Sequence, residues 1–309
     1  MPPRAQAPRR QHLQPLDRLL MRAAFMYTLL CASESLMRLE SRMPLPLVQG
    51  HRGSPYAAPE NTIESFLEAA AAGADCVELD AQLTADGHVV VFHEESGDVS
   101  AYTDGSMLIS HMSLDQVRSL RFAASALHCP ADRVPGCRIP TLEDVLVAIR
   151  DRTCMSVTVE LKAARVELPA LDVVRRCGML SRVNMSSFVH DRVIAAKLAE
   201  PSLSISLLFN ANSAPTPSDF VTLCRAAGAC QADIRYDMLS RAHVAQAHAN
   251  GVKVMAWCRS PEAMIQAGHA DEEQLFASLL DTGADVICTN FPAKLSAFLA
   301  AKKEAVRDA

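Results

Sequence analysis

Short apolar runs and longer amphipathic stretches alternate along most of the chain. The apolar runs have the length of buried strands, and the stretches between them place apolar residues at helical spacing. A regular succession of strand and helix is typical of an α/β fold with a parallel sheet. The runs that we predict to be strands are 47–51, 76–80, 88–93, 155–162, 183–187, 203–208, 230–234, 252–257 and 285–289.

The amphipathic stretches are predicted to be the helices that connect these strands. Gly73 ends the first helix, and Gly251 and Gly283 each precede a strand, where a glycine suits the end of a helix. The candidate strands are one more than an eight-stranded barrel holds, so one is over-predicted or lies outside the ring. The predicted helices are 60–72, 113–122, 141–149, 190–199, 218–227, 239–250, 260–282 and 292–301.

Polar side chains close three apolar runs in the first third of the chain: His51, Glu78 and His93. A parallel-barrel enzyme places such groups at the mouth of the barrel. Glu78 and Asp80 are two residues apart, so on a strand both side chains point to the same face. Adjacent carboxylates are unfavourable unless a cation lies between them, and oxygen ligands favour Mg²⁺ or Ca²⁺.

Composition narrows the classes of partner. Half of the residues are hydrophobic, which is enough for a full core. The formal net charge of −5 and the low aromatic content of 5% argue against a nucleic-acid partner. The cysteines form no CxxC pair, and we interpret them as small buried hydrophobes in a reducing compartment. They are residues 31, 76, 129, 137, 154, 177, 224, 230, 258 and 288.

The first part of the chain differs from the rest. Residues 1–20 are rich in Pro and Arg, and the apolar run 23–32 is too short to span a bilayer after Arg22. The run fits a secretory signal, an Arg-rich organellar presequence, or an extension outside the working protein, with Met43 as a possible start. We therefore predict that residues 1–42 are a disordered or targeting extension. The expected location is cytoplasmic, with mitochondrial or secreted as the alternatives.

A set of motifs in a fixed order resembles the glycerophosphodiester phosphodiesterase family over residues 47–296. The resemblance implies a TIM (β/α)8 barrel over residues 43–301, with a small insertion over the barrel mouth at about 94–139 and a charged tail at 302–309. The motifs are HRG at 51–53, PENT at 59–62, GADCVELD at 73–80, TADG at 84–87, VVVFH at 89–93, PTLE at 140–143, VELK at 159–162, SSF at 186–188, VMAW at 254–257 and GADVICTNFP at 283–292.

The resemblance also implies a site and an activity. The activity is metal-dependent hydrolysis of glycerophosphodiesters to sn-glycerol 3-phosphate and an alcohol, with either water or the glycerol 2-hydroxyl as the first nucleophile. A rim salt bridge is the alternative for Glu160 and Lys162, and core packing is the alternative for Trp257. The implied roles are acid–base catalysis by His51 and His93, divalent cation binding by Glu78, Asp80 and Glu160, phosphate contact by Arg52 and Lys162, and a wall against the glycerol or head group by Trp257.

The chain departs from the family pattern at Glu94, where an Asp is usual, and at 102–103, where Tyr-Thr replaces Arg-Thr. Two alternative functions stay open. The first is lysophospholipase D-type cleavage of a lysophospholipid, and the second is an inactive barrel that binds phosphodiesters. The first needs an apolar channel, for which the insertion offers Met107, Leu108, Ile109, Met112 and Leu114.

The position of His93 presents a conflict. The TADG turn at 84–87 between two apolar runs predicts a hairpin, which would carry His93 to the far end of the barrel from Asp80. The chemistry needs both residues at the same end. We therefore expect residues 81–86 to lead to the opposite end of the barrel, so that the next strand can run back to the mouth. Glu60 is expected to hold the loop at a helix start, and Asn61 is a weaker candidate for the site.

Overall fold

The computed structural model describes residues 45–94, 96–210, 217–258 and 271–307. Its strands match the predicted runs closely. They are β1 (Leu47–His51), β2 (Cys76–Leu83), β3 (Val89–Val91), β4 (Ser156–Leu161), β5 (Val183–Ser187), β6 (Ser204–Phe209), β7 (Gln231–Arg235), β8 (Lys253–Trp257) and β9 (Val286–Thr289).

Most of the longer helices follow the strands as predicted, and α5 is the one that was not predicted. They are α2 (Ile63–Ala71), α3 (Leu114–Ser119), α4 (Leu142–Arg152), α5 (Glu167–Arg176), α6 (His190–Ala199), α7 (Pro217–Ala227), α8 (Arg241–Ala249), α10 (Glu272–Thr282) and α11 (Pro292–Arg307). Residues 260–270 of one predicted helix, and the whole predicted extension 1–42, lie outside the described residues. In the described part of the chain, no helix combines the length and apolar character needed to cross a membrane.

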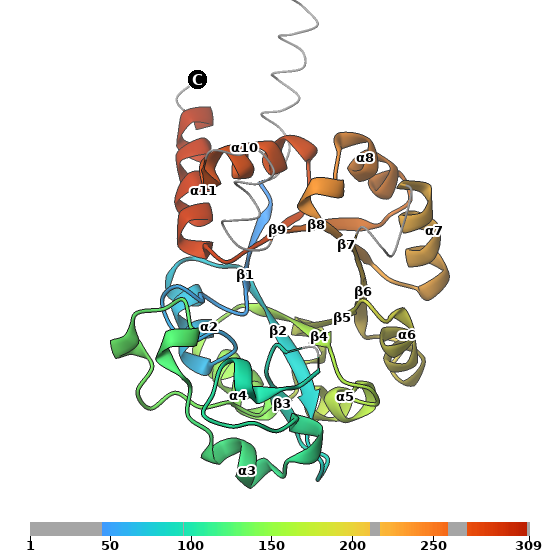
Figure 1. The fold of residues 1–309 in the computed structure, drawn as a ribbon. Helices are drawn as coiled ribbons and strands as arrows, with labels where there is room; N and C mark the ends of the chain where they lie inside the picture. The colour runs from blue at the N-terminus through green and yellow to red at the C-terminus, as the bar shows by residue number, and fades with distance from the viewer. Residues whose placement is uncertain (1–44, 95, 211–216, 259–270, 308–309) are drawn as a thin grey trace, which may run out of the picture. The chain divides into compact units, whose positions relative to one another are not determined.

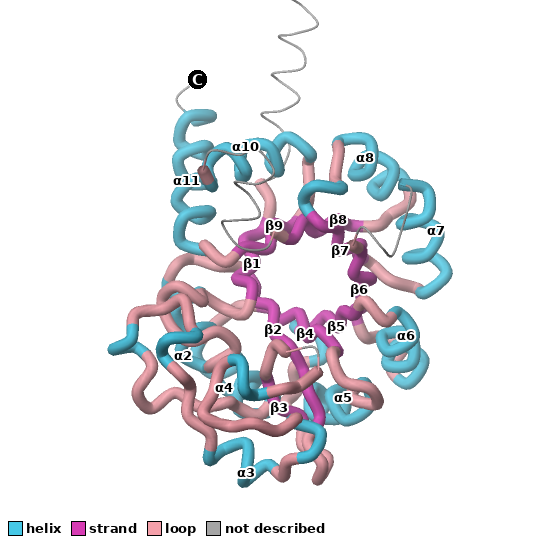
Figure 2. Tube along the Cα trace, viewed as in Figure 1, coloured by secondary structure: helices cyan, strands magenta, loops and turns pink. Residues whose placement is uncertain are grey.

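Eight parallel strands close into a ring in the order β1-β9-β8-β7-β6-β5-β4-β2, and β1 pairs with β2 to complete it. Figure 2 shows this ring end-on, with helices packed around its outside. Outward residues such as Val77, Leu79, Val157 and Val159 are buried between the strands and the helices. The predicted TIM barrel is therefore confirmed, and β3 is the ninth strand that lies outside the ring.

The conflict over His93 is resolved by the length of β2. This strand continues three residues past Asp80, to Leu83, and β3 returns antiparallel along it, with Val91 opposite Ala81. The N–H of Phe92 donates to the carbonyl of Asp80 at 2.9 Å. The hairpin therefore projects beyond the barrel mouth and comes back to it, which leaves His93 at the same end as Asp80. The expected descent of residues 81–86 was wrong, although the predicted location of His93 at the mouth is correct.

Several helices differ from the predictions, and α3 and α4, for example, end at Ser119 and Arg152 rather than at 122 and 149. Helix α2 begins at Ile63 because Thr62 caps it, its side chain accepting from the N–H of Ser65. Helix α5 was missed, because Pro169 discourages a helix prediction but is tolerated in a first turn whose N–H groups lack intrahelical partners. Helix α11 continues past residue 301 to Arg307.

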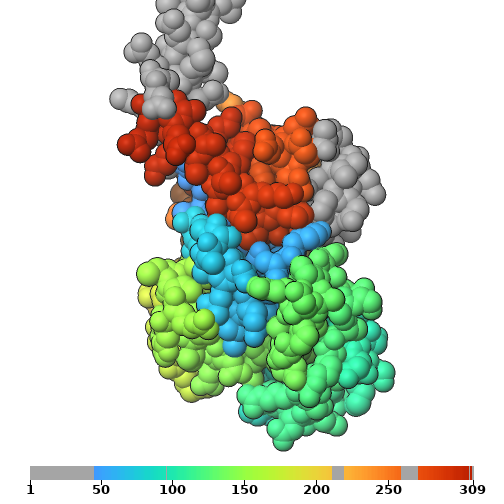
Figure 3. Space-filling model, turned by 90° about the vertical axis from the view of Figure 1, so that its left-hand side faces the viewer, coloured from blue at the N-terminus to red at the C-terminus, as the bar shows by residue number. Residues whose placement is uncertain are grey.

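The insertion after β3 has a small hydrophobic core of its own and stands at the barrel rim beside β2 and α4 (Figures 1 and 3). Short 3-10 helices and α3 make up most of its regular structure. Ile109 and Met112 are buried in this core, and Leu114 packs against it, so they do not line a channel. The core consists of Val90, Phe92, Val99, Ile109, Met112, Val117, Leu120 and Ile139.

The cysteines of the described residues are all free, and most of them are buried. Only Cys154 and Cys230 are exposed. The interpretation of most cysteines as small buried hydrophobes is confirmed for this part of the chain.

Candidate active site

The candidate site is assembled from the carboxyl ends of neighbouring strands. His51 closes β1 and lies opposite Glu78 of β2 in the parallel ladder, and Asp80 lies opposite Glu160 of β4. The strand pairing therefore places four of the predicted site residues side by side at the barrel mouth. Their alternation with outward apolar residues follows from the two-residue period of a strand.

Glu78, Asp80 and Glu160 form one buried cluster. Each offers a carboxylate oxygen, and these three oxygens lie within 4.8 Å of one another. Burial, followed by repulsion from Asp80 and Glu160, raises the pKa of Glu78 well above its usual range. Burial also raises the pKa of Glu160. Burial opposes ionisation of Asp80 as well, but Lys162, His93 and Arg52 hold the pKa of Asp80 below its ordinary value.

The cluster has the properties of a metal site. Glu78 Oε1 and Asp80 Oδ1 are buried and accept no hydrogen bond from the described residues. Buried acceptors without a hydrogen bond are rare in protein interiors, and a cation satisfies both the charge and the lone pairs. The three carboxylates can therefore hold a metal ion, and their oxygen-only character favours a hard cation.

Two cations flank the carboxylates. Lys162 Nζ lies 2.7 Å from Glu160 Oε1 and 3.5 Å from Asp80 Oδ1. Arg52 Nε lies 3.4 Å from Asp80 Oδ2, and the Arg52 backbone N–H donates to Glu78 Oε2 at 3.1 Å. The ion pair that was the alternative interpretation of Glu160 and Lys162 is present, and it lies inside the site.

The loop that carries Arg52 has an unusual backbone. Arg52 has a positive φ of 55°, and Gly53 follows with a φ of 88°. A side chain at Gly53 would overlap the backbone of Ser65, because its Cβ would lie 2.6 Å from a carbonyl carbon. Glu60 Oε1 accepts from Arg52 Nη1 at 2.9 Å, so the expected loop-holding role of Glu60 is confirmed, although it precedes the helix.

Asn61 also reaches the site. It adopts a left-handed backbone conformation with a φ of 58°, which Asn tolerates better than most residues. Its Nδ2 donates to Asp80 Oδ2 at 2.8 Å, and its Oδ1 accepts from the Asp80 N–H at 3.3 Å. Asn61 and Arg52 thus both contact Oδ2 of Asp80, whereas Lys162 lies against Oδ1.

The two histidines lie in different surroundings. His51 Nδ1 is 2.6 Å from Asn290 Oδ1, and its Nε2 is 3.9 Å from Glu78 Oε2. Burial, followed by the charge of Arg52, lowers the pKa of His51 to about 3. His93 follows β3, and its Nδ1 is 3.9 Å from Glu94 Oε1, which is longer than a hydrogen bond.

Asn290 is a contact that the sequence reasoning missed. It directly follows β9, and it lies within the GADVICTNFP motif at 283–292. A polar residue that closes an apolar strand was the available signal, the same signal that identified His51 and Glu78.

One cavity at the barrel mouth brings most of these groups together. It is lined on one side by both histidines, Arg52, Lys162 and two of the carboxylates. On the other side it is lined by Phe188, Leu208, Met255, Trp257 and Cys288. Trp257 and Phe188 pack edge to face with ring centroids 5.8 Å apart. Trp257 is 8% exposed, so it contributes both to the cavity wall and to core packing.

The two departures from the family pattern lie beside this cavity. Glu94 is partly exposed, and its carbonyl accepts a hydrogen bond from Gln82 Nε2. Tyr102 packs edge to face on Phe92 at 5.9 Å, and burial together with the charge of Glu60 raises its pKa. The insertion therefore brings a phenol close to the charged side of the site.

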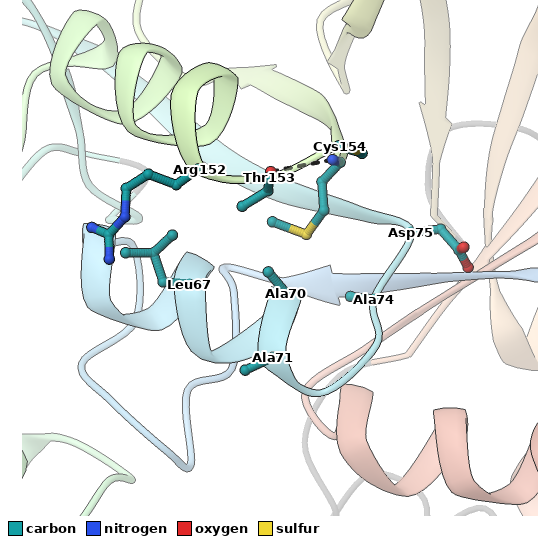
Figure 4. Close-up of a pocket in the computed structure, with 9 residues that line it drawn as sticks. Leu67, Ala70, Ala71, Ala74, Asp75, Arg152, Thr153 and Cys154 are labelled. Carbon is teal, nitrogen blue, oxygen red and sulfur yellow. Dashed lines mark hydrogen bonds between the residues drawn. The ribbon is translucent and has the colours of Figure 1, made fainter.

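A larger cavity of about 580 Å³ lies at the opposite end of the barrel, between the ends of α2 and α4 (Figure 4). Its walls are mainly Leu67, alanines of α2 and Met155, with Arg152 at one side. Its one carboxylate, Asp75, accepts from the backbone N–H of Val48 at 2.8 Å. This cavity lacks the paired histidines and clustered carboxylates of the barrel mouth.

Comparison of the sequence with known proteins identifies relatives of one enzyme family. The model of the Glycerophosphoryl diester phosphodiesterase family matches residues 51–294. The Glycerophosphodiester phosphodiesterase of Caldanaerobacter subterraneus subsp. tengcongensis is 35% identical over 168 residues, which cover 53% of this chain and 66% of that protein. A protein of the same name from Bacillus altitudinis is 25% identical over 247 residues, which cover 78% of this chain and 93% of that protein.

Solved structures give the same result. One from Galdieria sulphuraria has a TM-score of 0.73 at 28% identity, covering 84% of this chain and 99% of that chain. A phosphodiesterase from Oleispira antarctica, solved in complex with the product sn-glycerol-3-phosphate, has a TM-score of 0.69 at 25% identity. The match covers 83% of this chain and 97% of that one.

Proposed function

This chain belongs to the glycerophosphoryl diester phosphodiesterase family, and from that premise we propose that it hydrolyses a glycerophosphodiester to sn-glycerol 3-phosphate and an alcohol. One observation carries the proposal. Two histidines, three carboxylates and two cations from separate strands and loops converge on a single barrel mouth. The product bound in the Oleispira antarctica structure, sn-glycerol-3-phosphate, is the product expected here.

The metal of this reaction is proposed to be Mg²⁺ or Ca²⁺, held by Glu78, Asp80 and Glu160. The buried Oε1 of Glu78 and Oδ1 of Asp80, which accept no hydrogen bond from the described residues, support this assignment. When bound, the ion offsets negative charge on the phosphoryl oxygens. Lys162 and Arg52 line the cavity beside these carboxylates and are proposed to contact the phosphate.

His51 and His93 are proposed to be the acid–base pair. Burial favours the neutral form of His51 by lowering its pKa. In that form one ring nitrogen can accept the proton of the attacking hydroxyl, which belongs to water or to the glycerol of the substrate. His93, which lines the same cavity, then gives a proton to the oxygen of the leaving alcohol. The attacking oxygen forms its bond to phosphorus as the bond from phosphorus to the leaving oxygen breaks. If the glycerol hydroxyl is the nucleophile, water must then open the resulting cyclic phosphate to give sn-glycerol 3-phosphate.

The uncharged side of the cavity suits the carbon skeleton of the substrate. Trp257 and Phe188 provide flat apolar surfaces in the same cavity, where a glycerol or head group can pack. None of the five insertion residues named for an acyl channel lines this cavity. Ile109 and Met112 are buried in the core of the insertion, whereas Met107 is exposed. The geometry therefore favours a soluble diester over a lysophospholipid.

Turnover of glycerophosphocholine and lysophosphatidylcholine tests the proposal directly. We expect release of sn-glycerol 3-phosphate from the first substrate with Mg²⁺ or Ca²⁺, and much slower cleavage of the second. In the same assay, His93→Ala should lower turnover. His88→Ala is its matched control, because His88 is exposed in the same hairpin. Faster cleavage of the lysophospholipid would reverse the substrate assignment, and no turnover of either diester would reject the function.

A further inference from the structure

We propose that Asn290 is a positioning residue that holds His51 in one tautomer, with the proton on Nδ1 and the lone pair of Nε2 directed toward the cavity. The inference rests on the proposed function for the role of His51, but it is measurable without turnover. The contact that carries it is the 2.6 Å distance between His51 Nδ1 and Asn290 Oδ1.

The chemistry of the two groups fixes the tautomer. The carbonyl oxygen of an asparagine side chain only accepts hydrogen bonds, so the ring nitrogen that meets it must donate. A neutral imidazole has one N–H, so Nδ1 carries the proton and Nε2 keeps its lone pair. Nε2 lies on the side of Glu78 Oε2, at 3.9 Å, and His51 lines the cavity. The ring therefore presents its basic nitrogen to the place where a substrate hydroxyl would lie.

The backbone holds the two residues in place. Gly50 lies opposite Thr289 in the ladder between β1 and β9, so His51 and Asn290 leave neighbouring strands at the same level. Thr289 Oγ1 accepts from the N–H of Phe291 at 3.1 Å, which turns the chain directly after Asn290.

Aromatic stacking fixes the same loop from its other side. The ring of Phe291 stacks on Tyr56, from the loop after β1, with centroids 4.5 Å apart. Lys294 Nζ lies over the Phe291 ring at 4.6 Å from its centroid. The two loops that carry His51 and Asn290 are thus attached to each other at two points, one polar and one aromatic.

A neutral partner suits this position. Three carboxylates already surround the cavity, and an aspartate in place of Asn290 would bring a fourth negative charge to the same mouth. The amide orients the ring without adding charge, whereas a carboxylate would also stabilise the doubly protonated imidazolium, which has no lone pair to accept a proton.

The test combines kinetics with the ring ¹⁵N signals of His51 in the Mg²⁺-loaded full chain. The signals are assigned by their loss in His51→Gln. In the parent we expect a pyrrole-like Nδ1 and a pyridine-like Nε2. Asn290→Leu should exchange the two signals or mix them, and kcat should fall at least about tenfold with little change in KM.

Asn290→Asp keeps the acceptor and should restore the Nδ1–H signal that Asn290→Leu loses. Asn184→Ala is the matched control, because Asn184 donates to Ser206 Oγ at 2.9 Å inside the barrel. It should leave the His51 signals and kcat unchanged.

An Nδ1–H signal that persists in Asn290→Leu, or that is lost equally in Asn290→Asp, would overturn the proposal. If Asn290→Leu does not fold, Asn290→Ala gives the same comparison. A parent enzyme with the expected tautomer but no diesterase activity would reject the proposed function and leave the positioning contact standing.

Discussion

Asp233, a carboxylate outside the candidate site, gives a direct prediction of how the stability of the protein depends on pH. It points into the barrel from β7 and is 0% exposed. Ser206 Oγ donates to its Oδ2 at 2.5 Å, and Gln231 Nε2 donates to its Oδ1 at 2.8 Å. Burial raises the pKa of Asp233 from 3.8 to about 7, because its neutral hydrogen-bond partners do not offset the loss of water.

This raised pKa makes the folded state less stable as the pH rises. Between 3.8 and about 7 the folded protein keeps a proton that the unfolded chain has already released. Stability therefore falls through this interval and is constant above it. From pH 5 to pH 7 the loss is two pH units at about 1.4 kcal/mol each, or about 3 kcal/mol.

Asp233→Asn removes this titration while keeping the shape of the protonated acid. Its amide nitrogen can donate to Ser206, and its oxygen can accept from Gln231. Relative to the parent, the variant is expected to gain about 3 kcal/mol in the free energy of unfolding between pH 5 and pH 8.

Equilibrium urea unfolding of the metal-free protein at both pH values measures the change. Asp115→Asn, at an exposed site on α3, is the control and should show no such gain. A difference between Asp233→Asn and the parent that stays flat, or shrinks, from pH 5 to pH 8 would refute the reasoning.

Further predictions concern the site itself. His51→Ala and His93→Ala should each lower kcat by about 10²- to 10⁴-fold, and the double variant by much less than the product, because the pair acts as a unit; full additivity would argue against a shared step. Glu78→Gln should abolish the gain in Tm that Mg²⁺ or Ca²⁺ gives to the parent, and an unchanged gain would exclude Glu78 as a ligand. Asn61→Gly keeps the left-handed backbone but removes the contact to Asp80, so calorimetry should show metal affinity about 10-fold weaker or more.

The strands and most site residues could be predicted from the sequence, because their signals are local. A buried parallel strand is a short apolar run, and a polar residue that closes it marks the barrel mouth. His51 and Glu78 carry that signal, and the structure brings them together with Asp80 and with Glu160, whose role the family resemblance implied.

Other features depend on contacts between distant segments, which no local pattern contains. The extra length of β2 exists because β3 pairs with its last residues, and that pairing places His93. The contact of Asn290 with His51 joins residues 239 positions apart. Asn61 reaches Asp80 through a left-handed backbone that the motif does not reveal.

Because of the hairpin, the two histidines are held in place by different parts of the fold. His51 ends a strand of the barrel, whereas His93 follows β3, whose Val89 and Val91 pack into the barrel core while Val90 and Phe92 pack into the core of the insertion. A segment exchange that replaced the insertion with that of a relative would therefore also replace the support of His93. The insertion cannot be treated as an accessory that only selects substrates, because half of the proposed acid–base pair depends on its packing.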